Sequence, residues 1–149
     1  MSGIDFLASI AELYDRSMAP VSSSFGLTAT ELSILLFLAN NPGYDTARGI
    51  VEKRHLAKSH VSVSLRALEE GGLIRKEHRN GDNRTVHLVL LPASEDMIRE
   101  GLQAQAEFLS TVTCGFSTEE LSRFRSEIGR MNENVLAALQ NNRKGKHSK

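Results

Sequence analysis

The chain has 149 residues, of which 40% are hydrophobic and 24% are charged, and its 18 lysines and arginines balance 18 aspartates and glutamates. This composition predicts one folded domain of ordinary size and excludes a wholly disordered chain. No apolar run approaches the roughly 18 residues of a membrane span, the first residues lack the basic start of a secretory signal, and a single cysteine cannot form an internal disulfide. We therefore expect a cytoplasmic protein with no membrane partner.

The balanced charge is unevenly distributed along the chain. Residues 1–47 carry one base against five acids, residues 48–87 carry nine bases against five acids, and residues 88–149 carry eight of each. The first two segments therefore have net charges of −4 and +4. A basic central segment can present a positive surface to phosphate even in a neutral chain, which favours a nucleic-acid partner.

The first third of the chain predicts two helices. Residues 4–18 place apolar side chains at helical spacing, and Pro20 with the serine run that follows it is expected to end that helix. Thr28 and Glu31 have the spacing of a capping box, which predicts a second helix over residues 29–39. An Asn-Asn-Pro-Gly run follows and predicts the end of that helix.

The next segment predicts two short helices and a β-hairpin. The helices cover residues 47–53 and 58–70, and the few residues between them allow only a tight turn. Gly71 and Gly72 are expected to end the second helix. Two alternating runs, residues 73–79 and 85–91, then flank an Asn-Gly-Asp-Asn sequence, which is a strong hairpin signal.

The last third predicts two longer helices. Residues 92–113 form the first, with Pro92 at its first turn. A second capping box at residues 117–120 begins a helix that is expected to end near Leu139. The polar, basic tail that follows is expected to fray.

A helix–turn–helix followed at once by a hairpin is a winged helix-turn-helix. In this arrangement the second helix fits the major groove of DNA, the first braces it, and the hairpin tip reaches the neighbouring backbone or minor groove. The expected fold class is therefore mainly α with a small β wing.

Three short sequences, in their order and spacing, resemble the MarR family of bacterial and archaeal transcriptional regulators. Thr46–Ser62 is similar to the helix-turn-helix of that family, Leu68–Ile74 to the end of its recognition helix, and Asp82–Arg84 to the Asp-x-Arg motif of its wing. The flanking helices also match the family layout, so the resemblance covers most of the chain.

The resemblance implies a homodimer that is joined by the N-terminal and the two C-terminal helices and that represses transcription from a pseudo-palindromic operator. It also implies a small effector, often phenolic, bound between the dimerisation and DNA-binding regions; some members use a cysteine instead, and a few use zinc. The expected domains are an N-terminal dimerisation helix, a winged helix-turn-helix, C-terminal dimerisation helices and a disordered basic tail, over residues 1–27, 28–92, 93–140 and 141–149.

The chain departs from the family pattern around the turn. Arg54 replaces an apolar residue, His55 a common glycine, and Ala57 the usual Ser, Thr or Asp cap of the recognition helix. A missing cap costs about 1 kcal/mol. After the wing, Leu91-Pro92 replaces the familiar Leu-Thr.

A helical projection of residues 58–70 separates a core face from an outward face. Val61, Leu65 and Leu68 share the core face, while the outward face carries small residues and the apolar Val63. A merely solvated face would carry glutamate and lysine, so we favour contact with base edges. The predicted contact residues are Lys58, Ser59, His60, Ser62, Val63 and Arg66.

The hairpin tip and two further arginines complete the predicted DNA surface. Asp82 is expected to orient an arginine that enters the minor groove; a solvated turn, or a local ion pair worth under about 1 kcal/mol, is the alternative. The predicted wing contacts are Arg79, Asn80, Asp82, Asn83 and Arg84. Arg48 and Arg54 are candidates for phosphate contact.

No motif indicates catalysis, a metal or a cofactor. The sequence lacks a nucleophile elbow and a phosphate-binding glycine loop, so we expect no enzyme. His55 and His60 lie five positions apart and find no further ligands for a zinc site. Cys114 has no lysine or arginine near it in sequence, so we expect a small packing residue rather than a redox sensor.

The sequence therefore predicts a regulator that binds a specific sequence of double-stranded DNA as a homodimer and responds to a small-molecule effector as a repressor. Two alternatives remain open. One is a winged-helix module for protein–protein contact without specific DNA binding, which strongly salt-dependent duplex binding would exclude. The other is a metal-responsive regulator, which metal analysis of the purified protein would test.

Overall fold

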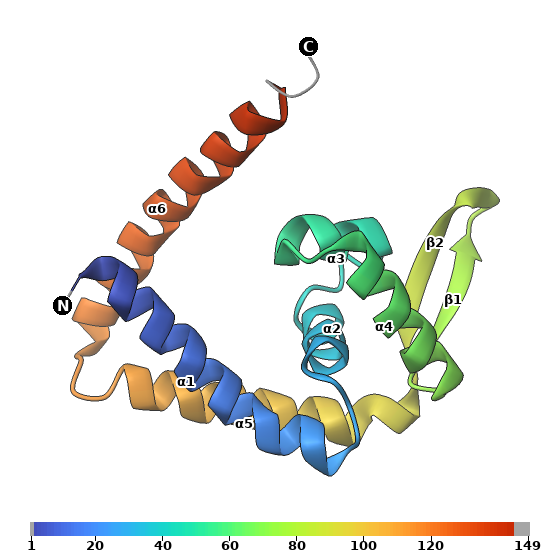
Figure 1. The fold of residues 1–149 in the computed structure, drawn as a ribbon, viewed down its shortest axis with the longest axis horizontal. Helices are drawn as coiled ribbons and strands as arrows, with labels where there is room; N and C mark the ends of the chain where they lie inside the picture. Colours follow the sequence, from blue (N-terminus) through green and yellow to red (C-terminus); the bar gives the residue numbers. More distant parts are fainter. Residues whose placement is uncertain (1, 145–149) are drawn as a thin grey trace. The chain divides into compact units, whose positions relative to one another are not determined.

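The computed structural model describes residues 2–144, with side chains described to residue 141 (Figure 1). The chain divides into two compact units between Leu109 and Ser110. The first unit contains, in order, α1 (Gly3–Ser24), α2 (Ala29–Asn40), α3 (Ala47–Arg54), α4 (Lys58–Glu70), β1 (Ile74–Arg79), β2 (Asp82–Leu90), the 3-10 turn η1 (Pro92–Ser94) and most of α5 (Glu95–Val112). The second contains α6 (Thr118–Lys144). Mostly helical structure with one two-stranded antiparallel sheet confirms the expected fold class.

Helix α1 continues six residues beyond Met18, so the prediction that Pro20 ends it is wrong. Pro20 lies inside the helix, where a proline costs about 3 kcal/mol. Met18 and Val21, on either side of it, are buried in an apolar cluster with residues of α2. Each such burial stabilises by about 1.5–3 kcal/mol, which together offsets the proline.

A glycine turn ends α1 instead. The N–H of Leu27 donates to the carbonyl of Ser22 at 2.8 Å, and the N–H of Gly26 donates to that of Ser23 at 3.2 Å. Gly26 has φ +65°, a left-handed conformation that glycine adopts readily. This pair of bonds is a Schellman motif.

Both predicted capping boxes are confirmed. The N–H of Glu31 donates to Thr28 Oγ1 at 3.1 Å, and the N–H of Thr28 donates to Glu31 Oε2 at 3.0 Å. The same exchange between Ser117 and Glu120 begins α6. Each exchange satisfies two backbone N–H groups that the first turn of a helix leaves without partners.

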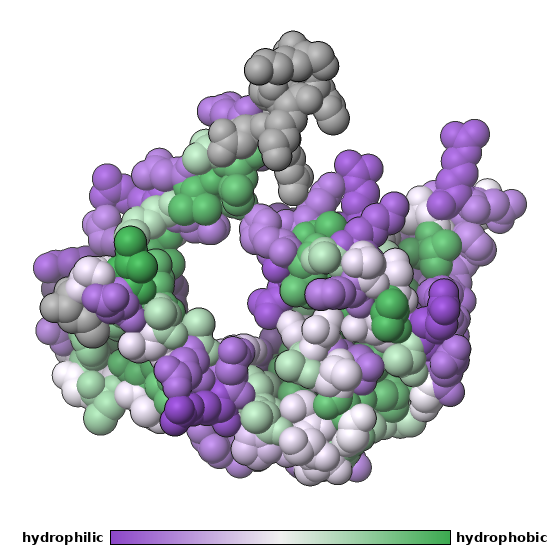
Figure 2. Space-filling model, viewed as in Figure 1, coloured by the Kyte–Doolittle hydropathy of each residue, from purple (hydrophilic) through white to green (hydrophobic). Residues whose placement is uncertain are grey.

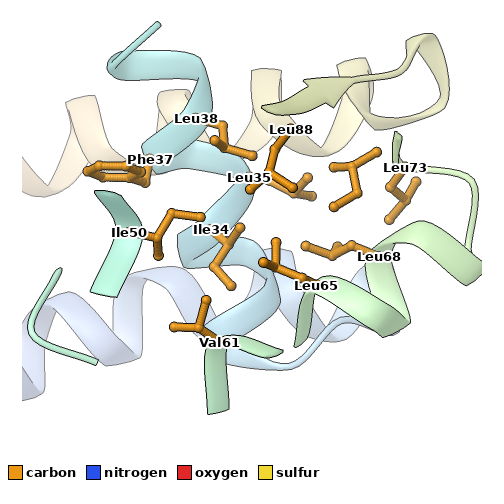
Figure 3. Packing of buried hydrophobic residues seen from close by; sticks show 11 residues of the cluster. Ile34, Leu35, Phe37, Leu38, Ile50, Val61, Leu65, Leu68, Leu73 and Leu88 are labelled. Atoms are coloured by element: carbon orange, nitrogen blue, oxygen red, sulfur yellow. The ribbon is translucent and has the colours of Figure 1, made fainter. Parts of the chain in front are cut away.

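Helix α2 is the centre of the first unit. Its apolar residues pack against α3, α4 and the wing, so the helix is buried on most sides (Figure 3). The cluster consists of Ile34, Leu35, Phe37, Leu38, Ile50, Val61, Leu65, Leu68, Leu73, Ile74 and Leu88. A second cluster joins α2 to α1 and α5, and there Gly101 of α5 approaches Leu36 so closely that an added Cβ would lie 2.7 Å from its Cδ2 atom.

The wing has a tighter turn than the sequence predicts. Strand β2 begins at Asp82 rather than at Thr85, because only Asn80 and Gly81 form the turn between the strands. Both have positive φ, 53° and 74°, as the mirror-image type I′ turn of a two-residue hairpin requires. The residues that were expected in the loop therefore lie at the start of the strand.

The C-terminal helices differ from expectation at their ends. Pro92 begins a single 3-10 turn, and α5 proper starts at Glu95. Helix α6 reaches Lys144, beyond the expected end at Leu139, because no glycine or proline lies between Leu139 and Gly145. Residues 145–149, the end of the tail expected to be disordered, lie outside the described residues.

Within residues 2–144, no single helix is long and apolar enough to cross a membrane. Only α1 and α2 taken together, across a bend of 97°, meet that requirement of length and composition.

Candidate nucleic-acid interface

Helix α4 presents the predicted contact residues on its exposed side. Val61 is 1% exposed and belongs to the core, whereas Val63 is 68% exposed. The other predicted residues of this helix are exposed as well: Lys58, Ser59, His60, Ser62 and Arg66. The predicted phase of the helix is confirmed, and one branched apolar side chain stands on its solvent-facing side.

The turn before α4 contains the unusual residues that the sequence indicated. Ala57 precedes the helix in extended backbone and makes no side-chain cap. His55 lies in the left-handed region, with φ 52°, which costs a non-glycine residue about 1–2 kcal/mol. Leu56, between them, packs on the apolar cluster around α2. Packing therefore holds this turn in place of a cap.

The two arginines predicted to contact phosphate both have partners within the chain. Arg48 Nε donates to Glu52 Oε1 across 2.8 Å, and Arg54 Nη2 donates to Ser33 Oγ across 2.8 Å. Both arginines are exposed. Contact with DNA would require each of them to exchange or share its present partner.

Asp82 organises the backbone of the wing tip. Its Oδ1 accepts hydrogen bonds from the backbone N–H groups of Arg84 at 2.8 Å and Thr85 at 3.3 Å. Hydrogen bonds from the Thr85 side chain and from these N–H groups hold the pKa of Asp82 below its ordinary value. Asp82 thus fixes the chain under Arg84 rather than pairing with its guanidinium, which has no ion-pair partner among the described residues.

Arg79, on the other side of the tip, is bound to two carboxylates. Its Nη1 lies 2.7 Å from Asp45 Oδ2, and its Nε lies 2.7 Å from Glu77 Oε1. Asp45 also binds His87, whose Nδ1 lies 2.9 Å from Asp45 Oδ1. Burial raises the pKa of Asp45, but the hydrogen bonds from His87 and Arg79 outweigh that effect and hold the pKa below its ordinary value.

Sequence reasoning missed Asp45. It lies in the loop between α2 and α3, 34 positions before Arg79 and 42 before His87. No local pattern marks an acid that pairs over such distances. The sequence gives only an indirect signal for a role of Asp45. It is one of two acidic residues between the end of α1 and Arg48, where the basic segment begins.

Helix α4 and the wing are adjacent. Strand β1 begins shortly after α4 ends, and the wing extends beside that end of the helix (Figure 1). Lys76 Nζ of β1 lies 2.6 Å from Glu69 Oε2 of α4, which ties the two elements together. Hydrophilic side chains cover the projecting wing tip (Figure 2).

A cavity of about 380 Å³ lies beside α1, α2 and the end of α3. Its lining is largely apolar, with Met18, Leu32 and Leu36, and Asp15 and Arg54 bring one charge of each sign to it. Tyr14, which also lines it, accepts a hydrogen bond of 2.7 Å from Gln105 Nε2 of α5. The cavity therefore adjoins the last residue of α3, just before the turn to α4.

Two further predictions concern metal and cysteine chemistry. Among the described residues, no group of three or more His, Cys, Asp or Glu side chains could hold a metal ion. Cys114 is exposed at the turn after α5, which differs from the packed position expected for it.

Comparison with known proteins identifies relatives of this chain. Residues 25–85 match the MarR family. The chain is 28% identical over 135 residues to the HTH-type transcriptional regulator PecS of Dickeya dadantii (strain 3937), covering 89% of this chain and 81% of PecS.

Solved structures of similar fold include two complexes with DNA. A MarR-family regulator of Listeria monocytogenes bound to a 26-mer DNA has a TM-score of 0.81 at 15% identity, covering 91% of this chain and 89% of that one. The MepR–DNA complex of S. aureus has a TM-score of 0.75 at 16% identity, covering 90% of this chain and 96% of MepR. These structural likenesses show the fold.

Proposed function

We propose that this chain, which belongs to the MarR family of transcriptional regulators, recognises a specific sequence of double-stranded DNA and represses transcription by occupying it. The outward face of α4 carries the proposal, because Val63 is exposed there among serines, His60 and Arg66. Small side chains allow close approach to base edges, and a branched aliphatic tip suits the methyl group of thymine.

The remaining residues of α4 complete the proposed major-groove contact. His60 and Arg66 can donate to guanine N7 or O6, and Ser59 and Ser62 can donate or accept. Lys58, at the first turn of the helix, would contact phosphate. Base contacts would supply sequence preference, and the phosphate contact would set the orientation of the helix.

The wing supplies the second part of the proposed interface. Arg84 is exposed, and its backbone is held by Asp82, so its guanidinium can enter a narrow minor groove. Asn80 and Asn83 lie at the exposed tip, and we propose that they contact the sugar–phosphate backbone. Arg48 and Arg54 belong to the same proposed surface, and each would exchange its present partner for phosphate. Arg79 lies beside the wing tip, where it is bound to Asp45 and Glu77.

We further propose that the protein is a homodimer. Helix α6 exposes a stripe of apolar side chains at helical spacing, which appears as green along α6 in Figure 2: Phe124, Ile128, Met131, Val135 and Leu139. Helix α1 also exposes Ile4 and Leu7. Faces of this kind need a partner, and a two-fold axis is the commonest solution. Two-fold symmetry in turn predicts a pseudo-palindromic operator.

The cavity beside α1 and α2 is the proposed effector site. It adjoins Arg54, whose bond to Ser33 joins the end of α3 to α2. A phenolic ligand would bury its ring among the apolar residues and accept a hydrogen bond from Arg54, which would then leave Ser33. A compound that binds there should raise the melting temperature of the wild-type chain more than that of Arg54→Met.

Selection of bound sequences from random duplex DNA tests the proposed function. We expect one enriched sequence with two-fold symmetry, and an affinity that falls steeply as salt rises, because phosphate contacts release counterions. The alternative, a module for protein–protein contact, predicts no enrichment and weak binding without a steep salt dependence.

A further inference from the structure

We propose that Asp45, in the loop between α2 and α3, is a positioning residue that fixes the wing for DNA binding; this inference rests on the proposed function. The carboxylate lies outside the predicted DNA surface. It acts through Arg79 and His87, one on each strand of the wing.

The outer half of the wing has no apolar anchor of its own. Toward the tip, Leu88 is the last buried residue of β2, and Val86 beyond it is exposed. The pairing of the strands also shifts between Glu77 and Arg79. A two-stranded hairpin is only marginally stable alone, so polar contacts have to set the direction of this tip.

Asp45 supplies three such contacts at one point. Its Oδ2 accepts from Arg79 of β1 at 2.7 Å, and its Oδ1 accepts from His87 of β2 at 2.9 Å. Its backbone carbonyl accepts from the N–H of Leu88 at 2.7 Å. The side chain of Asp45 is only 17% exposed, so water competes little for these bonds. Because the bonds reach both strands, they restrain the direction in which the hairpin points as well as its distance from the loop that carries Asp45.

Asp45 is itself held on the frame that carries α4. Before it, Asn41 Nδ2 donates to the carbonyl of Phe37 in α2 at 2.9 Å. After it, Thr46 Oγ1 accepts from the N–H of Gly49 at 3.0 Å and caps α3. The loop is therefore tied at one end to α2, which packs against α4, and at the other end to α3 of the helix-turn-helix. The bonds of Asp45 connect the wing to that frame.

A direct phosphate contact by Arg79 is the competing explanation for the basic charge at the wing. The two explanations predict opposite changes in DNA affinity when Asp45 is neutralised. Removing a carboxylate near a polyanion should strengthen binding electrostatically, and freeing Arg79 should add a contact. If Asp45 positions the wing, its neutralisation weakens binding instead, because Arg84 is no longer held at the groove.

The test compares wild type, Asp45→Asn, Arg84→Ala and the double variant on the selected operator, across a range of salt concentrations. We expect Asp45→Asn to bind roughly tenfold more weakly, and less than about twofold more weakly when Arg84→Ala is already present. We also expect the slope of log affinity against log salt to fall by roughly one for Asp45→Asn, although the chain has become more positive. Partial unfolding would lower the affinity without changing that slope.

Glu70→Gln is the matched control, since it removes one exposed carboxylate from the end of α4. It should leave the affinity unchanged or raised. Arg79→Gln breaks the same link from the other side, so it should weaken binding as Asp45→Asn does. Combined with Asp45→Asn, it should weaken binding little further. Circular dichroism confirms that each variant is folded at the assay temperature.

Equal or tighter binding by Asp45→Asn would overturn the positioning role, as would a loss that adds fully to that of Arg84→Ala. Failure of the wild-type chain to bind any duplex would instead contradict the proposed function itself. The wild-type titration therefore distinguishes the two failures.

Discussion

Val63 differs from the other exposed residues of α4 in having a branched aliphatic side chain. Val61, two positions earlier, is buried in the core, whereas Val63 is exposed. Packing therefore explains the valine at position 61 and does not explain the one at position 63. A lone exposed apolar residue is common in proteins. Its place among Ser59, Ser62 and Arg66, on a helix that the wing adjoins, is what favours a base contact over chance exposure.

Replacing Val63 by serine should affect sequence preference more than overall affinity. We expect Val63→Ser to cost about 1 kcal/mol at one symmetric pair of operator positions, the usual scale for a lost base contact. Binding to random DNA should hardly change, because no phosphate contact is removed. A competition assay against every single-base variant of the operator measures this. Val86→Ser, the same change on the wing, is the control; a uniform loss, or none, would contradict the base contact.

Arg84→Ala should weaken binding to most duplexes alike. The slope of log affinity against log salt should flatten by roughly one, as for the loss of one charge near phosphate. Folding should be unaffected, since the side chain is exposed and Asp82 bonds only to the backbone there. Salt titration measures the slope, with Arg99→Ala on α5 as a control of equal charge. An unchanged slope in a folded variant would show that Arg84 does not approach the DNA.

Single elements could be predicted from sequence where partners lie within one turn of each other. The capping box of Thr28 and the hairpin around Asn80-Gly81 are local in this sense, although β2 begins at Asp82 rather than at Thr85. The prediction that Pro20 ends α1 is wrong because the burial of Met18 and Val21 together outweighs the local effect of the proline, and sequence periodicity alone does not measure that burial. At the site, helical periodicity predicted which side of α4 is exposed. The pairing of Arg79 with Asp45 was not predictable, because it depends on how the loop folds against the wing.

The contact between α5 and α2 gives a test at the scale of two elements. Gly→Ala inside a helix ordinarily stabilises by about 1 kcal/mol. In Gly101→Ala the new Cβ would lie 2.7 Å from Leu36 Cδ2, and overpacking of this kind costs about 1–3 kcal/mol. We therefore expect a lower free energy of unfolding in urea. Gly129→Ala in α6, where nothing lies within 4 Å, should be neutral or stabilising; a stabilised Gly101→Ala would show that Leu36 moves freely.

The whole molecule is expected to be a dimer at micromolar concentration. Met131→Glu should shift it toward monomer and weaken operator binding, because it places a charge in the exposed apolar stripe of α6. Ser126→Glu adds the same charge on the other side of that helix and should leave the dimer intact. Light scattering gives the mass of each variant. A monomeric wild-type chain would contradict the proposed assembly.

The most direct test of the central claim is the affinity of the unmodified chain for its selected operator, compared with a shuffled duplex of equal length and composition at physiological salt. We predict two chains per operator and a preference for the operator on the order of 10³ or more, as for other sequence-specific regulators. Equal affinity for the two duplexes, or no binding to either, would contradict sequence-specific recognition by α4 and the wing.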